Sequence, residues 1–267
     1  MPPNVIILLH DYNRKETFFM KLHLLQPMGG AGMRFSQDVG FDVPKPLIPI
    51  HGKPFFYWSA KSITERMPVA RITFVLLQEH IDKFGLDKEV LKYFPEAQIA
   101  VLPHQLNGPV LTCLTGLSQV ELATDEALLI NDCDHMLRCD ELAFLVDNSD
   151  ERFNSLVTFK SQEPCFSYVK YEDGKFAGTV EKKVVSEDAI CGAYMYKNAQ
   201  TFIDAANKLL ERGTGDYAEF FLSDTYNILK DQGESVRVMS LDVHTSFGTP
   251  AEYREVIKPE HDKEFIL

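Results

Sequence analysis

The glycine-rich segment PMGGAGMRF, residues 27–35, is the part of the sequence most clearly suited to a chemical role. Glycine lets the backbone approach a phosphate closely and turn its N–H groups toward it, so Gly29, Gly30 and Gly32 are candidate anion binders. Arg34 adds the forked donor set of a guanidinium. The dinucleotide-binding pattern G-x-G-x-x-G lacks its third glycine, and no Gly-Lys-Ser/Thr follows. Neither a dinucleotide fingerprint nor a Walker motif is therefore predicted.

Lys45 stands between two prolines in a second segment, residues 43–54 with the sequence VPKPLIPIHGKP. Proline fixes φ and restricts the residue before it, so this lysine belongs to a stiff extended segment and not to a long helix. A single loop lysine or arginine is more often a solvated charge. A phosphate-binding role for Lys45 therefore depends on the segments that accompany it.

Two aspartates, Asp132 and Asp134, come directly after the apolar run ALLIN at residues 127–131. On a strand, residues i and i+2 point to the same side, so both carboxylates can face one cation, and Mg²⁺ prefers oxygen ligands. One of the two, more readily Asp132, would otherwise cap a helix that follows.

A charged pair, Glu181 and Lys182, follows a hairpin signalled by EDG at residues 172–174. The carboxylate is suited to accept hydrogen bonds from hydroxyl groups, and the ammonium is suited to hold a phosphate. A charged hairpin end is otherwise an ordinary solvated edge. Gly192, inside the apolar run 189–196, would let a substrate approach the strand; the alternative is a β-bulge.

Short apolar runs alternate with longer amphipathic segments around these residues, which predicts parallel strands joined by crossover helices. Ligands bind beyond the carboxyl ends of the strands in open α/β sheets, so the loops after Met28, Leu102 and Asn131 are the expected location of a site. The expected strands are 22–28, 72–77, 98–102, 127–131, 155–160, 166–171, 189–196 and 235–241. The expected helices are 54–63, 82–94, 109–120, 199–212, 217–231 and one that begins at Pro250.

Length and composition exclude several classes of protein. The 267 residues, 45% of them hydrophobic and 25% charged, suit one large α/β domain. A net charge of −12 argues against a general nucleic-acid binder. No apolar run approaches the roughly 20 residues that span a bilayer, and no signal-peptide pattern is present, so we expect a cytoplasmic protein without membrane insertion. The five scattered cysteines predict free thiols and no zinc site.

Several further segments complete a pattern when they are read with GGAGMRF and PKPLIPIHGKP. They are NGPVLTCLTGL (107–117), LLINDCDHM (128–136), VEKK (180–183), ICGAYMY (190–196) and FGTPAEY (247–253). In this order, over about residues 20–257, they resemble the motifs of the sugar-phosphate nucleotidyltransferase family, the nucleotide-sugar pyrophosphorylase-like enzymes. The resemblance implies an α/β fold, Rossmann-like and GT-A-like, with a mostly parallel central sheet, flanking helices and a small β-rich substrate-binding portion.

The resemblance also implies an activity: transfer of NMP from an NTP to a phosphorylated sugar or similar phosphate ester, with release of pyrophosphate, in nucleotide-sugar and polysaccharide biosynthesis. It implies Mg²⁺ as cofactor, held by Asp134 and Asp132, and catalytic roles for Arg34 and Lys45. The acceptor-binding residues would be Glu181, Lys182 and Gly192. The nucleotide-binding residues would be Gly29, Gly30, Ala31, Gly32, Gln105, Asn107 and Gly108.

If the resemblance holds, residues 1–19 are an N-terminal extension of uncertain structure, and residues 20–267 are one nucleotidyltransferase domain. Its nucleotide-binding part is 20–153 and its acceptor-binding part is 154–267. The expected partners are an NTP and a small phosphorylated acceptor, with no nucleic acid; a homo-oligomer stays open. The amide side chains of the 105–108 loop do not specify a base, since they can serve several.

One departure from the pattern keeps alternatives open. Many members of the family carry an aspartate two residues before the glycine of the closing Gly-Thr, and this chain has Ser246 there. Asp132 or Asp242 would have to replace it. A GT-A-type glycosyltransferase is one alternative, because Asp132-Cys133-Asp134 is a D-x-D, although such an enzyme has no need of GGAGMRF and PKPL. A catalytically silent nucleotide-sensing subunit is the other, and the missing aspartate favours it.

Overall fold

The computed structural model describes residues 20–30, 32, 35, 40, 42–149, 151–215 and 217–265. The predicted extension over 1–19, and the candidate residues Ala31 and Arg34, lie outside them. The strands are β1 (Lys21–Met28), β2 (Pro49–Ile50), β3 (Lys53–Pro54), β4 (Val69–Leu77), β5 (Gln98–Leu102), β6 (Glu126–Asn131), β7 (His135–Arg138), β8 (Asn154–Lys160), β9 (Tyr168–Glu172), β10 (Lys175–Val180), β11 (Asp188–Tyr196), β12 (Val236–Ser240) and β13 (Val243–Ser246). The helices are η1 (Lys45–Leu47), α2 (Phe55–Thr64), α3 (Gln78–Phe84), α4 (Leu86–Tyr93), α5 (Pro109–Leu117), α6 (Asp140–Asn148), α7 (Ala199–Arg212), α8 (Leu222–Asp231), α9 (Pro250–Val256) and η2 (Pro259–Phe265).

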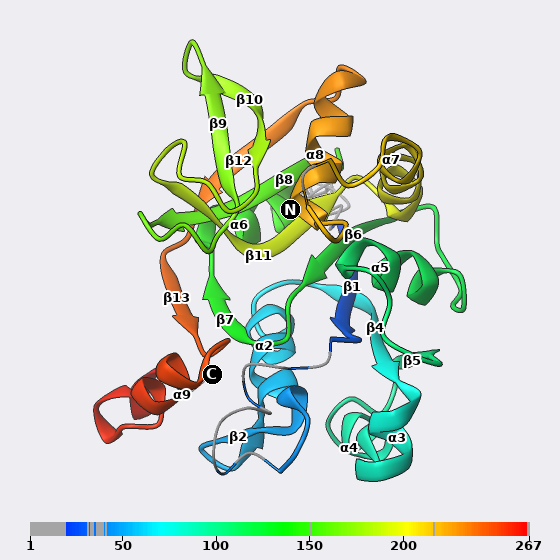
Figure 1. Ribbon diagram of the computed structural model, residues 1–267, viewed down its shortest axis with the longest axis vertical. Helices are drawn as coiled ribbons and strands as arrows, with labels where there is room; N and C mark the ends of the chain where they lie inside the picture. The colour runs from blue at the N-terminus through cyan, green and yellow to red at the C-terminus, as the bar shows by residue number, and fades with distance from the viewer. Residues whose placement is uncertain are drawn as a thin grey trace, which may run out of the picture.

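The main sheet has nine strands, with the order β10-β9-β11-β6-β1-β4-β5; β8 also pairs with β11, and β12 pairs with β8 (Figure 1). Strands β5, β4, β1 and β6 are all parallel, and the strand order reverses between β1 and β6. Strand β11 joins β6 antiparallel and carries the β-rich second half of the chain. The expected α/β fold with a mostly parallel central sheet is confirmed.

Helices cover both faces of this sheet and bury its central strands β1 and β6 almost completely. Leu22 and Leu24 of β1 belong to one core, with α2, α4 and α6, whereas Leu25 belongs to the core on the other face, with α5, α7 and α8. A strand buried on both faces reads as a continuous apolar run, which explains why β1 is so clear in the sequence. A third, smaller core joins distant parts of the chain through the aromatic side chains Phe35, Phe55, Trp58, Phe247 and Phe265.

Some elements differ from the expectation. The helix expected over 82–94 is two helices, because Gly85 adopts a left-handed conformation (φ 64°) between α3 and α4. Helix α8 begins at Leu222 and not at residue 217. Helix α6 and the separate two-stranded sheet of β7 and β13 were not expected. All five cysteines are free, as expected.

No helix in the part of the chain that the structure describes combines the length and the apolar character needed to cross a membrane.

Candidate active site

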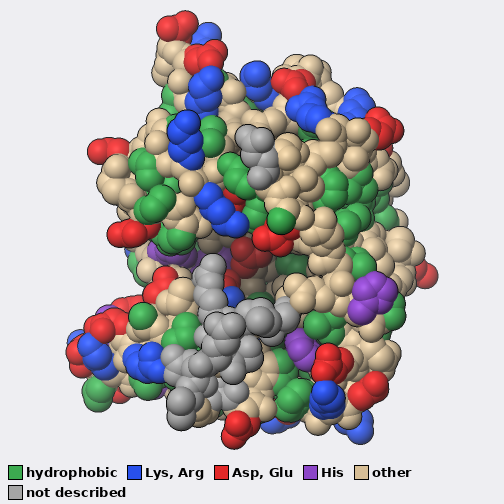
Figure 2. All heavy atoms as spheres, in the orientation of Figure 1, with side chains coloured by type: hydrophobic (Ala, Val, Ile, Leu, Met, Phe, Trp, Pro, Cys, Tyr) green, Lys and Arg blue, Asp and Glu red, His purple; other side chains and the backbone are tan. Residues whose placement is uncertain are grey.

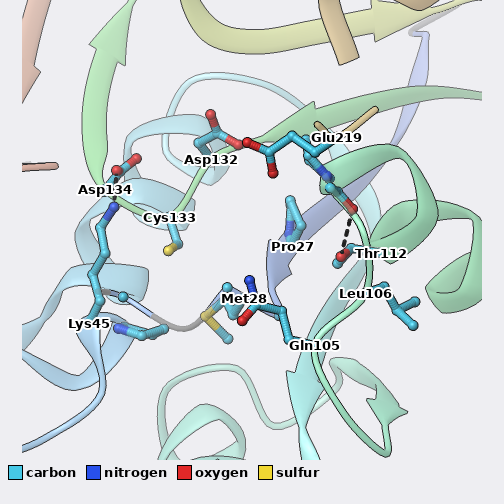
Figure 3. Close-up of a pocket in the computed structure, with 16 residues that line it drawn as sticks. Pro27, Met28, Lys45, Gln105, Leu106, Thr112, Asp132, Cys133, Asp134 and Glu219 are labelled. Carbon is cyan, nitrogen blue, oxygen red and sulfur yellow. Dashed lines mark hydrogen bonds and ion pairs between the residues drawn. The ribbon is translucent and has the colours of Figure 1, made fainter. Parts of the chain in front are cut away.

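Two cavities meet at the carboxyl ends of the parallel strands. The larger cavity, about 430 Å³, is lined by residues that follow β1, β5 and β6, together with the start of α5 and Glu219 (Figure 3). The smaller cavity, about 310 Å³, is lined by the turn after β6, the segment before β9, the middle of β11 and the segment that follows β13. Asp132 and Asp134 line both cavities. A reaction between two bound molecules would therefore take place beside these two carboxylates.

The glycine-rich segment lines the larger cavity through Gly29, Gly30 and Gly32. A Cβ atom on Gly29 would lie 2.7 Å from Leu102 Cδ1, so this position has no room for a side chain. Gly32 has a φ of 63°, and a Cβ atom there would lie 3.1 Å from Lys45 Cβ. Glycine is required at Gly32 because the backbone is left-handed there and passes close to Lys45.

Lys45 forms an ion pair with Asp134 (Figure 3). It lies in the short helix η1, between Pro44 in an extended conformation and the buried Pro46, so its backbone is restrained on both sides. Burial disfavours both charges, but the carboxylates beside Lys45 raise its pKa, and the ammonium lowers the pKa of Asp134. The lysine is thus charged and held at the junction of the two cavities.

Asp132 is held against β11. Its backbone N–H donates to Gly192 O at 3.0 Å, and a Cβ atom on Gly192 would lie 2.7 Å from Asp132 Oδ2. Gly192 has a φ of 94° and lies where the pairing of β11 with β8 shifts register. The β-bulge considered for Gly192 from the sequence is therefore present. Burial, together with repulsion from Asp134, raises the pKa of Asp132 to about 7. Gly192 thus lines the smaller cavity and also makes room for Asp132.

The turn that follows β6 leads into β7 and not into a helix, so Asp132 is not a helix cap. Strand β7 pairs with β13, and this pairing brings the closing segment to Asp134: Phe247 N–H donates to Asp134 O at 3.0 Å. A Cβ atom on Gly248 would lie 2.6 Å from Asp134 Oδ2. The segment that carries Ser246 therefore packs directly on the candidate metal ligand.

The residues present fit a Mg²⁺ ion bound largely through substrate. Within the described ranges, no group of three or more His, Cys, Asp and Glu side chains is arranged to hold a metal ion. Asp242, one candidate for the missing carboxylate, accepts a hydrogen bond from Asp140 N at 2.7 Å, at the start of α6, and lines neither cavity. Asp132 and Asp134 are therefore the two carboxylates left as candidate Mg²⁺ ligands. Mg²⁺ is commonly held by one or two carboxylates plus substrate phosphates, and a cation there would offset the repulsion that raises the pKa of Asp132.

Glu181 is buried in the wall of the smaller cavity. Its Oε2 atom accepts hydrogen bonds from Ser167 Oγ and, at 3.0 Å, from Ser223 Oγ. Lys182 does not line this cavity; its Nζ lies over the ring of Phe221, 4.4 Å from the centroid, and Phe221 does line it. The pair is therefore divided: Glu181 lines the cavity, and the exposed Lys182 contacts the ring of Phe221 without lining the cavity.

The loop after β5 meets the expectation only in part. Gln105 and Gly108 line the larger cavity, whereas Asn107 is exposed and does not. Gly108 has a φ of 96°, and a Cβ atom there would lie 2.5 Å from Phe220 O. This close packing brings Glu219 to the larger cavity, opposite Gln105 (Figure 3). Sequence reasoning missed Glu219 because nothing near it in the chain signals a site.

Comparison with known proteins gives matches only at the level of structure: no protein-family model and no curated protein match the sequence. The nucleoside-diphosphate-sugar pyrophosphorylase from Vibrio cholerae RC9 is similar with a TM-score of 0.73 and 19% identity, covering 88% of this chain and 99% of that one. The inositol-1-phosphate CTP transferase from T. maritima is similar with a TM-score of 0.71 and 18% identity, covering 94% and 100%. A putative glucose-1-phosphate thymidylyltransferase from Bacillus anthracis, with sucrose bound, is similar with a TM-score of 0.69 and 17% identity, covering 91% and 96%. The chain therefore has the fold on which these nucleotidyltransferases are built.

Proposed function

We propose that the protein is a nucleotidyltransferase that transfers NMP from an NTP to a phosphorylated sugar or similar phosphate ester and releases pyrophosphate. The observation that carries this proposal is the pair of cavities that meet at Asp132 and Asp134, with the Lys45 ammonium between them. The larger cavity would take the NTP and the smaller one the acceptor. The structural neighbours described above, a nucleoside-diphosphate-sugar pyrophosphorylase and an inositol-1-phosphate CTP transferase among them, support the same reaction class.

The reaction requires a phosphate oxygen of the acceptor to form a bond to the α-phosphorus of the NTP while the bond from that phosphorus to the pyrophosphate oxygen breaks. No covalent intermediate with the protein is needed, so the task of the site is to align two anions and offset their repulsion. The N–H groups of the glycine-rich segment would hold the triphosphate. Lys45, kept protonated by its carboxylate neighbours, would stabilise charge at the α-phosphate.

A Mg²⁺ ion, bound by Asp134 and Asp132, would supply electrostatic stabilisation of the phosphate oxygens. Asp132 thereby replaces the carboxylate that Ser246 does not provide. We place the reaction in the cytoplasm, and in nucleotide-sugar and polysaccharide biosynthesis.

The two other interpretations predict different behaviour of the same sites. A glycosyltransferase would use Asp132 and Asp134 to bind a nucleotide-sugar and would release a nucleoside diphosphate. A nucleotide-sensing subunit would bind NTP without turnover. The two-cavity geometry favours the nucleotidyltransferase, because a sensing subunit needs no second cavity beside the carboxylates.

The decisive experiment measures pyrophosphate release from each NTP with a panel of sugar 1-phosphates and other small phosphate esters, alongside nucleotide-sugar consumption and NTP binding. Pyrophosphate release that requires both an NTP and an acceptor supports the proposal. Nucleotide-sugar consumption, or binding without turnover, contradicts it.

Lys45→Ala gives the proposal a residue-level test. We expect kcat to fall by about 10² to 10³, the usual effect of removing one well-placed donor at developing charge. Lys83→Ala is a matched control, since Lys83 is an exposed helix lysine paired with Glu79. Equal activity of the two folded variants would remove Lys45 from the site.

A further inference from the structure

The smaller cavity is rich in hydrogen-bond acceptors. Four carboxylates line it, those of Asp132, Asp134, Glu181 and Glu252, and no Lys, Arg, Asn or Gln side chain of the described residues does. Acidic side chains gather in the hollow between the two halves of the molecule (Figure 2). Lys45 pairs with Asp134 from the side of the larger cavity and offsets one of these charges, so the smaller cavity keeps an excess of carboxylates over cations.

Two of the neutral donors in its wall are engaged. The Ser167 hydroxyl donates to Glu181, and the Thr249 hydroxyl donates to Glu252 Oε2 at 2.9 Å. His135 and His244 also line the cavity, and both ring nitrogens of His135 and the Nε2 atom of His244 have no hydrogen-bond partner within the described chain. A ligand in this cavity therefore meets four carboxylates and a set of neutral donors.

Glu181 is the carboxylate with capacity to spare. Glu181 is only 5% exposed. The hydroxyl groups of Ser167 and Ser223 both donate to the same carboxylate oxygen, Oε2. The other oxygen, Oε1, has no hydrogen-bond partner within the described chain. Asp134 is paired with Lys45, and Glu252 completes the capping box of α9, so neither is free in the same way. Oε1 is therefore open to a donor from the cavity that Glu181 lines.

The chemistry of the ligand follows from this imbalance. A sugar hydroxyl can donate only one hydrogen bond to a carboxylate, whereas an ammonium group carries a positive charge and donates up to three. Phe166, Tyr194 and Phe221 also line the cavity, and aromatic faces attract cations. A cavity with an excess of carboxylates and with aromatic walls is matched by a small organic cation.

Resting on the transferase activity proposed above, we infer that the acceptor is a phosphate ester that carries an ammonium group, and that Glu181 binds this group. The phosphate end of the acceptor lies at the junction beside Asp132, Asp134 and Lys45, where the reaction requires it. The ammonium end lies in the smaller cavity, whose volume of about 310 Å³ suits a compact acceptor. Glu181 thereby becomes the specificity-determining residue, distinct from the groups at the reacting phosphates.

The test compares acceptors that differ only in charge. Phosphoethanolamine is paired with 2-hydroxyethyl phosphate, and glucosamine 1-phosphate with glucose 1-phosphate, each with the NTP that supports the fastest pyrophosphate release. We expect kcat/KM at pH 7 to favour the amine by tenfold or more in at least one pair. Pyrophosphate release without an amine preference in either pair overturns the inference and leaves the transferase activity standing. Absence of pyrophosphate release with every acceptor and NTP overturns both.

The variant Glu181→Gln assigns the preference to this residue. Glutamine keeps an oxygen that accepts from the two serines but removes the charge, so the amine-to-hydroxyl ratio of kcat/KM should fall toward one while NTP affinity is retained. Glu255→Gln, the same change at an exposed helix position paired with Lys258, should keep the wild-type ratio. A preference that survives Glu181→Gln in folded protein contradicts the role of Glu181, and the wild-type comparison decides the acceptor class even if this variant does not fold.

Discussion

Substitution of Gly192 tests two effects that usually occur together: strain in the backbone and displacement of a functional side chain. In Gly192→Ala the new methyl group would lie 2.7 Å from Asp132 Oδ2, where ordinary contacts begin at 3.4 Å. The Asp132 carboxylate must therefore withdraw by about 0.7 Å, and a misplacement of about 1 Å at a reacting centre can lower the rate by about 10²-fold. The left-handed backbone also strains the folded state, which lowers the free energy of unfolding by about 1–3 kcal/mol. We expect kcat/KM to fall by about 10²-fold.

Gly213→Ala is the matched control. Gly213 has a φ of 87°, close to the 94° of Gly192, but a methyl group there would meet nothing within 4 Å. Urea unfolding should show a comparable loss of stability in both variants, whereas pyrophosphate release should fall only in Gly192→Ala. If folded Gly192→Ala keeps its kcat/KM within about threefold of the wild type, Asp132 is not positioned for the reaction.

Three other changes test the remaining assignments. Asp134→Asn should abolish Mg²⁺-dependent turnover and Asp132→Asn should also lower it strongly, as a Mg²⁺ titration of pyrophosphate release would show; an unchanged Mg²⁺ dependence in Asp134→Asn would place the metal elsewhere. Lys182 does not line the smaller cavity, so Lys182→Ala should leave the acceptor KM and the NTP affinity within about threefold of the wild type in kinetics and calorimetry; a rise in acceptor KM of about tenfold, the worth of one charge-assisted contact, would place the ammonium on the acceptor after all. Burial, with repulsion from Arg71, lowers the pKa of His23 from 6.5 to about 4, so only the unfolded chain binds its proton between those values. The free energy of unfolding should therefore fall by up to about 3 kcal/mol as pH falls from 7 to 4, and His23→Gln should remove that part if the pKa shift is its cause.

The sequence predicts most strongly those elements whose pattern is local. Strand β1 is buried on both faces and β11 has eight buried residues of nine, so both read as apolar runs; α7 ends at the expected residues, because its period, its Asn198 cap and Gly213 are all local signals. The glycine segment and the two aspartates are predicted to lie near one another because the carboxyl ends of parallel strands meet at one edge. Lys45 joins them in the prediction only through the family resemblance.

What the sequence does not predict depends on distant partners. Strand β7 has only four residues and exists because β13 pairs with it, and no local pattern announces that pairing. Glu219 reaches the larger cavity only because Gly108 lies against Phe220. Asp242 could not be told from a metal ligand until its hydrogen bond to the start of α6 was known. Side-chain partners far apart in the chain are set by packing, which periodicity does not encode.

The small sheet of β7 and β13 also has a consequence for local unfolding. Every strand of the main sheet precedes Leu241 in the described chain, so that sheet is paired without the segment that follows β13. The backbone contact from Phe247 to Asp134, in contrast, depends on that segment. A local opening there would leave the framework and the larger cavity in place and would undo the junction of the two cavities, because small elements with few pairing partners open more easily than a central sheet.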